Sequence, residues 1–187
     1  DAVVWGFARA ASALGVDIVE QTEVLDIRVE AGAVTAVETS RGTVRTPKVA
    51  SVVAGHSSVI AGMVGVRLPI QSHPLQALVS EPIKPVLDCV VMSNAVHAYC
   101  SQSDKGELVI GAGIDHHNSY TQRGQIGLIE HQIAAIKEVF PIFSRLRMLR
   151  QWGGIVDVSP DASPIVTATP VKGFFLNGGW GTGGWKA

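Results

Sequence analysis

A glycine-rich segment near the end of the sequence is the pattern that most strongly suggests chemistry. Residues 177–186 read Asn-Gly-Gly-Trp-Gly-Thr-Gly-Gly-Trp-Lys and directly follow an apolar run that predicts a strand. Glycine loses more chain entropy on folding than other residues, so such a segment is expected where backbone approaches a flat ligand closely. If a helix begins near Gly183, its N–H groups favour negative charge, such as that on the N1–C2=O edge of a reduced flavin. An ordinary glycine-rich turn accounts for the segment equally well.

The remaining candidate segments give weaker signals. Residues 53–58, Val-Ala-Gly-His-Ser-Ser, match a hydrolase nucleophile elbow only in part, because Val59 stands where G-x-S-x-G requires its last glycine. His97 and Tyr99 lie two residues apart on a predicted strand and could line a pocket, although a core or edge histidine is the simpler interpretation. No third ligand accompanies the other histidines at metal-binding spacing. We therefore predict neither acyl transfer nor a metal site.

The composition predicts a folded domain rather than a disordered or nucleic-acid-binding chain. The 187 residues are 47% hydrophobic and only 17% charged, with a formal net charge of −1. The uncharged run Val49–Val66 is broken by glycines, serines and a histidine, which favours a strand, a turn and a helix over a membrane span. Cys89 and Cys100 lack CxxC spacing and are expected to be reduced core thiols. We expect a cytoplasmic protein that binds neither nucleic acid nor membrane.

The hydrophobic periodicity predicts an α+β (α/β) arrangement. Helices are expected over residues 3–14, near 59–64 and over 124–140, the last with Ile129, Ile133, Ile136 and Phe140 on one face. Val49–Ala54 is continuously apolar, which is typical of a strand buried on both faces. The other predicted strands alternate in polarity or are bounded by turn residues, and they cover 16–19, 23–30, 33–39, 42–45, 75–80, 90–93, 95–102, 108–112, 149–158 and 174–177. No G-x-G-x-x-G lies between a predicted strand and a predicted helix, so the phosphate-binding turn of a Rossmann unit is not expected among these residues.

Several of these segments together resemble one enzyme family. Residues 72–82, Ser-His-Pro-Leu-Gln-Ala-Leu-Val-Ser-Glu-Pro, and the glycine-rich segment are similar to the β subunits of bacterial heterotetrameric sarcosine oxidases. The similarity extends through Trp-Gly-Gly-Ile-Val-Asp at residues 152–157 and through Pro160 and Asp161. More broadly, the sequence resembles the group of FAD enzymes related to D-amino-acid oxidase, which includes monomeric sarcosine oxidase and dimethylglycine dehydrogenase.

The resemblance implies a domain organisation. It implies a fragment of a longer subunit, with part of a glutathione-reductase-type FAD-binding domain over residues 1–70, a mixed or antiparallel-sheet substrate domain over 71–148, and a return to the FAD-binding domain over 149–187. It also implies FAD contacts through Val24, which would lie against the adenine, through the turn Ala54–Gly55, and through Gly181, Thr182, Gly184 and Lys186 near the flavin ring. The fragment is expected to be inactive alone.

The resemblance also implies cofactors, a reaction and partners. The reaction is oxidation of sarcosine to glycine and formaldehyde, with electrons passing from FAD to FMN and then to oxygen, and with tetrahydrofolate accepting the formaldehyde. The FMN would be attached covalently to a histidine upstream of Asp1, and NAD is expected in the α subunit. The implied partners are the α, γ and δ subunits of a heterotetramer.

Two departures from the monomeric relatives refine these expectations. Val109 stands nearest the position at which those relatives carry a lysine for oxygen activation, which fits an FAD that passes electrons to a second flavin. No cysteine occurs in residues 152–164, where they attach FAD, so the FAD is expected to be noncovalent.

Lys186 is the expected cation for the substrate carboxylate, and Tyr99 is a candidate hydrogen-bond donor. Two alternatives remain: an oxidase or dehydrogenase for another secondary or tertiary amino acid, such as dimethylglycine or proline, and a non-catalytic interaction subunit.

Overall fold

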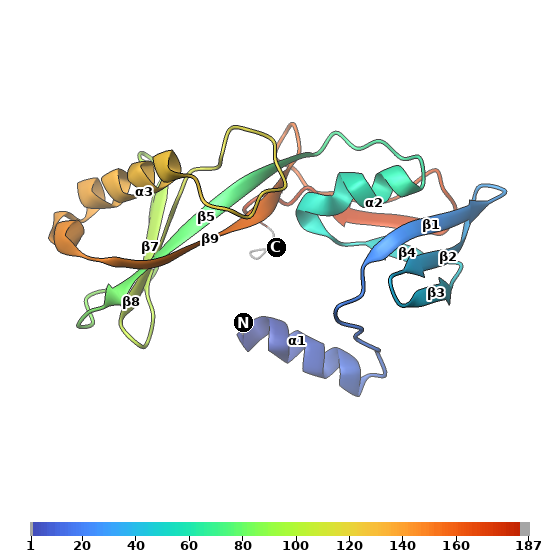
Figure 1. The fold of residues 1–187 in the computed structure, drawn as a ribbon, viewed down its shortest axis with the longest axis horizontal. Coiled ribbons are helices and arrows are strands. Elements are labelled where there is room, and N and C mark those ends of the chain that lie inside the picture. Colours follow the sequence, from blue (N-terminus) through green and yellow to red (C-terminus); the bar gives the residue numbers. More distant parts are fainter. Residues whose placement is uncertain (1, 184–187) are drawn as a thin grey trace.

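The α+β prediction is confirmed by the computed structural model, which describes residues 2–183 (Figure 1). The largest sheet is antiparallel, with the strand order β6-β7-β8-β5-β9. Its strands are β5 (Gln71–Pro82), β6 (Val91–Ser93), β7 (Ala98–Gln102), β8 (Glu107–Ala112) and β9 (Met148–Val158). β5 and β9 are the two long central ribbons of Figure 1, and they connect the region of the large sheet to the other structural region.

One face of the large sheet is covered by the helix α3 (Ile126–Val139), which packs on β7 and β8. The apolar face predicted for this helix is confirmed, because Ile136 is buried in the core and Ile129, Ile133 and Phe140 pack against that core. Alternate residues of β8, among them Leu108 and Ile110, complete the same core. The other face of the sheet therefore carries the intervening residues.

Buried glutamines attach α3 to the sheet. The Gln132 side chain is fully buried and donates to the carbonyl oxygens of Gln76, at 2.9 Å, and Ala112, at 3.1 Å. The Gln76 side chain accepts from the backbone N–H of Gln125, which precedes the helix, and donates to its carbonyl oxygen. Gln76 thus holds the residue that precedes α3 against β5, which fixes where the helix starts.

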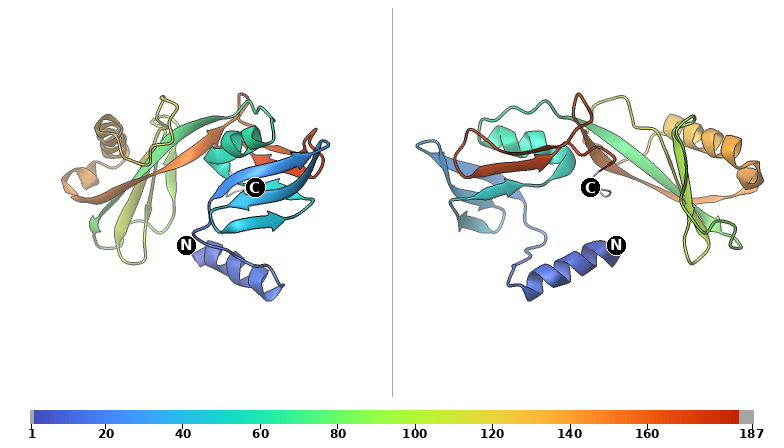
Figure 2. Two further views of the ribbon diagram at one scale, coloured as in Figure 1. Left: turned by 45° about the vertical axis from the view of Figure 1, so that its right-hand side comes forward. Right: turned by 180° about the vertical axis from the view of Figure 1, so that it is seen from behind.

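The other region consists of two small sheets and the helix α2 (Ser57–Met63), which contacts one strand of each sheet (Figures 1 and 2). One is an antiparallel meander of β1 (Val24–Glu30), β2 (Ala33–Thr39) and β3 (Gly42–Arg45), as predicted. The other has the order β10-β11-β4, in which β4 (Val49–Ser51) runs parallel to β11 (Phe174–Gly178) and β10 (Ile165–Ala168) runs antiparallel to it. Their shared core contains the buried residues Ile27, Val34, Ala61, Val64 and Phe174.

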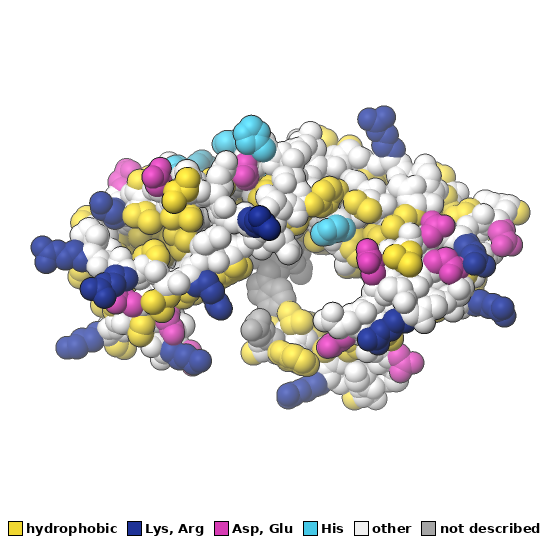
Figure 3. All heavy atoms as spheres, viewed as in Figure 1, with side chains coloured by type: hydrophobic (Ala, Val, Ile, Leu, Met, Phe, Trp, Pro, Cys, Tyr) yellow, Lys and Arg dark blue, Asp and Glu magenta, His cyan; other side chains and the backbone are white. Residues whose placement is uncertain are grey.

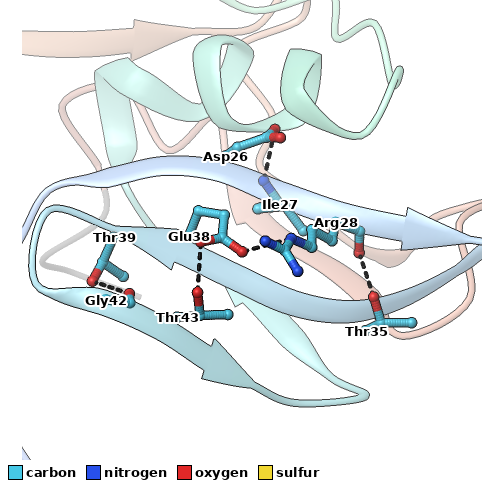
Figure 4. Close-up of polar contacts among 8 residues, drawn as sticks. All are labelled: Asp26, Ile27, Arg28, Thr35, Glu38, Thr39, Gly42 and Thr43. Carbon is cyan, nitrogen blue, oxygen red and sulfur yellow. Dashed lines mark hydrogen bonds and ion pairs between the residues drawn. The ribbon is translucent and has the colours of Figure 1, made fainter.

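The meander carries a polar network on its other face (Figure 4). Arg28 Nε lies 2.6 Å from Glu38 Oε1 on the neighbouring strand, and Thr43 Oγ1 donates to Glu38 Oε2 at 2.7 Å. These side chains span all three strands of the meander. Because they are partly exposed, the ion pair contributes little to stability but suits a surface in contact with water.

The helix α1 (Ala2–Ala13) stands apart from both regions (Figures 1 and 2). None of its residues is buried, although the helix carries large apolar side chains. Trp5 is 58% exposed and Phe7 is 73% exposed. The segment from Leu14 to Glu23 joins it to β1 without regular strand structure. The strand predicted for residues 16–19 was therefore wrong: these side chains are exposed and form no ladder with another strand of the described residues.

Three further sequence-based expectations differ from the structure. The strand predicted over Val49–Ala54 is only β4, which lies at the edge of its sheet, and Val52 is 63% exposed. Cys89 is exposed, whereas Cys100 is buried as expected and burial raises the pKa of its thiol to about 11. The strand β10 was not predicted. The domain division at residue 149 stays a prediction; β9, which covers that residue, pairs with β5 in the large sheet.

Candidate functional site

A pocket of about 320 Å³ opens where the large sheet meets the turn before α2 and the glycine-rich segment. Three residues predicted for the site line it together: Ala54, Tyr99 and Gly181. They come from three separate parts of the sequence and meet because β5 and β9 reach from one region to the other. The rest of the lining is mostly apolar, and comprises Leu75, Gln76, Ala77, Trp152, Gly154, Ile155, Val156 and Asp157. A mostly apolar pocket with a few polar groups is typical of a small-molecule site.

The turn that presents Ala54 is held by two serine hydroxyls. It is a single turn of 3₁₀-helix, Ala54–His56, in which Ala54 has a φ of 45°, an unusual value for a residue with a side chain. Ser57 Oγ donates to the Ala54 carbonyl oxygen at 2.6 Å, and Ser72 Oγ donates to that of Gly55. Ser57 is fully buried, so its hydroxyl is not available as a nucleophile in this arrangement.

Gly55 is required by the packing of the protein itself. A Cβ at Gly55 would overlap the Cγ2 and Cβ atoms of Ile155 on β9, so the backbone of the turn packs directly against that residue. The structure thus gives Gly55 a packing role that the sequence did not reveal. Contact between Gly55 and a cofactor stays a prediction.

Tyr99 is placed on the face of the large sheet opposite α3. Its cross-strand partner is Gly111 on β8, and a Cβ at Gly111 would overlap the Tyr99 ring atoms Cε1 and Cζ and the hydroxyl oxygen Oη. The absence of a side chain at Gly111 therefore lets the ring lie directly on the sheet. Burial raises the pKa of the Tyr99 phenol above its ordinary value of 10.0, so the hydroxyl is protonated at neutral pH and can donate a hydrogen bond.

Asp157 fixes the glycine-rich segment at the edge of the pocket. Its side chain is buried and accepts a hydrogen bond from the backbone N–H of Gly179, and its backbone carbonyl oxygen accepts from the N–H of Gly181 at 2.8 Å. Gly179 and Gly181 both have positive φ values, 76° and 55°, which side-chain-bearing residues adopt with strain. The sequence showed Asp157 only as part of a motif, and nothing in the motif indicated this pairing.

The small residues of the pocket suit a flat ligand such as a flavin ring. A Cβ at Gly154 would meet no atom within 4 Å, so packing within the described residues does not require glycine there. With Ala54, Ala77 and Gly181, it leaves backbone accessible along the pocket wall. The volume lies at the lower end of the roughly 300–1,000 Å³ found for ligand sites.

The structure places the other predicted site residues as follows. Val24 begins β1 and packs at the margin of the core around α2, and it is not among the residues lining the pocket. Thr182 is exposed beside Gly181. Gly184 and Lys186 lie outside the described residues. Val109 is on β8, two residues from Gly111 and on the same face as Tyr99.

Other candidate features do not form a comparable site. His56 faces the ring of Tyr120, with centroids 5.2 Å apart, and His97 lies in a turn with a φ of 48°. Within residues 2–183, no three acidic, histidine or cysteine side chains are grouped to hold a metal ion. No helix of the described residues is long and apolar enough to cross a membrane.

A larger hollow of about 820 Å³ lies nearby, between residues 67–71 and 158–160. It contains none of the predicted site residues, and Arg67 is the charged residue in its lining. The hollow is larger, but its lining lacks the groups expected to carry the chemistry. The smaller pocket, which combines Tyr99, Asp157 and the glycine backbone, is the better candidate.

Comparison with known families identifies one that matches throughout. The family described as "FAD dependent oxidoreductase" matches residues 1–187. Among solved structures, L-proline dehydrogenase from P. horikoshii superposes with a TM-score of 0.88 over 96% of this chain and 49% of its own, at 24% identity. At that identity the likeness concerns the fold.

Curated relatives are more similar in sequence. Sarcosine oxidase subunit beta of Rhodobacter capsulatus is 61% identical over 187 residues, which is 100% of this chain and 45% of the relative. The subunit of the same name from Arthrobacter sp is 56% identical over 186 residues, covering 100% of this chain and 46% of the relative. The chain thus spans about half the length of these relatives.

Proposed function

Because the chain belongs to the FAD dependent oxidoreductase family, we propose that it forms the substrate side of the active site in a subunit that demethylates sarcosine oxidatively to glycine and formaldehyde. The main support is the pocket in which Ala54, Tyr99 and Gly181 meet. The similarity to sarcosine oxidase β subunits supports the choice of substrate. Sarcosine is small enough to share a pocket of about 320 Å³ with one edge of a ring system.

FAD, when bound, supplies the electron acceptor for oxidation of the substrate N-methyl group. In this proposal Ala54, Gly154 and Gly181 give the ring close access to backbone, and Val24 lies toward the adenine end. The FAD is held noncovalently, since residues 152–164 contain no cysteine. Positioning then supplies much of the rate enhancement, because a correctly held amine reacts without further loss of orientational freedom.

The side chains of the pocket hold the substrate rather than exchange its protons. Tyr99, whose phenol is protonated at neutral pH, donates a hydrogen bond toward the substrate carboxylate. Lys186 supplies the cation for the same carboxylate, because a buried anion without a partner is strongly disfavoured. Leu75, Ala77 and Trp152 provide apolar surface that limits water around the methyl group.

The proposal extends to the assembly implied by the family resemblance. It includes a covalently attached FMN that receives the electrons, NAD in an α subunit, γ and δ subunits, and tetrahydrofolate as the acceptor of formaldehyde, in a cytoplasmic enzyme. These components rest on the resemblance and on the subunit naming of the relatives.

Anaerobic reduction tests the proposal. The complete subunit, assembled with its partners, is mixed with sarcosine without oxygen, and the visible absorbance of the oxidised flavin is followed. We expect the wild-type flavin to be bleached within seconds. The rate of bleaching should fall at least about tenfold in Tyr99→Phe and by about two to three decades in Lys186→Met. If sarcosine leaves the absorbance unchanged but dimethylglycine or proline bleaches the flavin, the assigned substrate is wrong and one of those amines takes its place. If no amine bleaches the flavin, the chain belongs to a non-catalytic interaction subunit.

A further inference from the structure

The glycine-rich segment is joined to the substrate sheet through one buried acidic residue. Asp157 is 2% exposed and lies on β9, at the position paired with Ser72 of β5. It lines the pocket together with Gly181. A carboxylate buried to this extent requires strong hydrogen-bond donors, since an unpaired buried charge is very unfavourable.

The donors that Asp157 finds are backbone groups of the segment itself. The carboxylate Oδ2 accepts the N–H of Gly179, and the backbone carbonyl oxygen accepts the N–H of Gly181 at 2.8 Å. Two bonds to residues two apart fix both the distance and the rotation of the chain between them. The preceding residue, Gly178, packs closely against Ser57. A Cβ at Gly178 would lie only 2.7 Å from the Ser57 Oγ.

We propose that Asp157 is a positioning residue, which holds the backbone of Gly179–Gly181 against the pocket through its side-chain and main-chain oxygens. This inference rests on the proposed function for its consequence in catalysis, because Gly181 is one of the residues given access to the ring and substrate. Loss of the carboxylate oxygen frees the Gly179 N–H and lets the segment move away from the pocket wall. The oxygen acceptor, and not the negative charge, is the essential property.

Three substitutions in the complete, assembled enzyme separate these properties. Asp157→Asn keeps an acceptor oxygen at the same reach and removes the charge. Asp157→Ser keeps a small polar group that is too short to reach the Gly179 N–H, and it is less disruptive than an alanine. Asp161→Asn is the matched control, because Asp161 is an exposed carboxylate four residues along, whose oxygen accepts the N–H of Ser163 in the following loop.

Two measurements report on the segment without depending on turnover. Hydrogen–deuterium exchange of the peptide containing Gly179 and Gly181 should accelerate at least about tenfold in Asp157→Ser and remain close to wild type in Asp157→Asn and Asp161→Asn. The visible circular dichroism of bound FAD should change in Asp157→Ser alone. With sarcosine, kcat should fall about tenfold or more in Asp157→Ser, with rescue by Asp157→Asn.

The outcomes distinguish this inference from the proposed function. Unchanged exchange in Asp157→Ser would overturn the positioning role, as would equal effects of the Asn and Ser variants, which would make the charge the important property. Loss of folding in Asp157→Ser would leave Asp157→Asn to decide, because accelerated exchange there contradicts an acceptor role. If wild-type enzyme is not reduced by sarcosine, the proposed function fails, while the exchange and dichroism results still decide the role of Asp157.

Discussion

The Tyr99 hydroxyl is a donor whose effect should not depend on pH in the neutral and mildly alkaline range. Burial raises the pKa of the phenol above 10.0, so the protonated form persists as the pH rises and is lost only above that value. Tyr99→Phe should lower kcat/KM for sarcosine by about 10- to 100-fold, as for a hydrogen bond to a charged group. The ratio to wild type should be constant from about pH 7 to about pH 9.5, measured with the complete enzyme. A ratio that narrows across this range would mean that Tyr99 titrates within it.

Substitution of Gly111 should lower activity as much as substitution of Tyr99, although Gly111 has no side chain. In Gly111→Ala the new methyl group would overlap the Tyr99 ring, which must then tilt away from the sheet. We expect a loss of sarcosine kcat/KM at least as large as that of Tyr99→Phe, and a much smaller additional loss when Gly111→Ala is made in a Tyr99→Ala background. Gly127→Ala on α3 is the control, since a Cβ there meets nothing within 4 Å. Additive effects of Gly111→Ala and Tyr99→Ala would contradict the contact.

Among the elements, α3 is attached to the sheet in part by the buried side chain of Gln132. Gln132→Met keeps the volume but leaves the carbonyl oxygens of Gln76 and Ala112 without their donor. We expect the free energy of unfolding to fall by about 1–3 kcal/mol, measured by denaturant unfolding. Glu130→Gln, at an exposed position on the same helix, should change it by less than about 0.5 kcal/mol. Equal stability of the two variants would show that the Gln132 bonds are not needed.

The elements also show how far local sequence patterns reach. The long helix α3, the meander and most strands of the large sheet follow from periodicity, because each has an apolar face that its neighbours bury. Residues 16–19 have the apolar composition of a strand, yet no partner strand lies beside them in the described structure. Their composition alone could not show whether they form a strand. Val49–Ala54 illustrates the same limit, since its length as a strand depends on β11, more than 100 residues later.

Of the candidate site, the sequence could indicate the residue types but not their contacts. Ala54 and Gly181 were expected from the family resemblance and Tyr99 from its place on a predicted strand, and the three meet in one pocket. The packing of Gly55 on Ile155, and the bonds from Asp157 to Gly179 and Gly181, depend on pairings of distant segments. Such pairings leave no periodic signal in a single sequence.

For the whole molecule, exposed apolar surface should govern the behaviour of these 187 residues expressed alone. The helix α1 buries none of its side chains, and Figure 3 shows hydrophobic groups on it at the lower part of the view. We expect self-association that strengthens with concentration, measured by light scattering after size exclusion. Trp5→Lys together with Phe7→Glu should reduce it, whereas Arg9→Glu, on the same helix, should not. A stable monomer before substitution would contradict this expectation.

The most direct test of the account is the position of the flavin ring in the complete subunit. A crystal structure with FAD and a sarcosine-like inhibitor should place one edge of the ring within van der Waals distance, about 4 Å, of Ala54 and Gly181. The inhibitor carboxylate should lie within hydrogen-bond distance of the Tyr99 hydroxyl, about 3 Å. A ring bound elsewhere, with the pocket formed by Tyr99, Trp152 and Gly181 left to solvent, would contradict the assignment of this pocket as the site of amine oxidation.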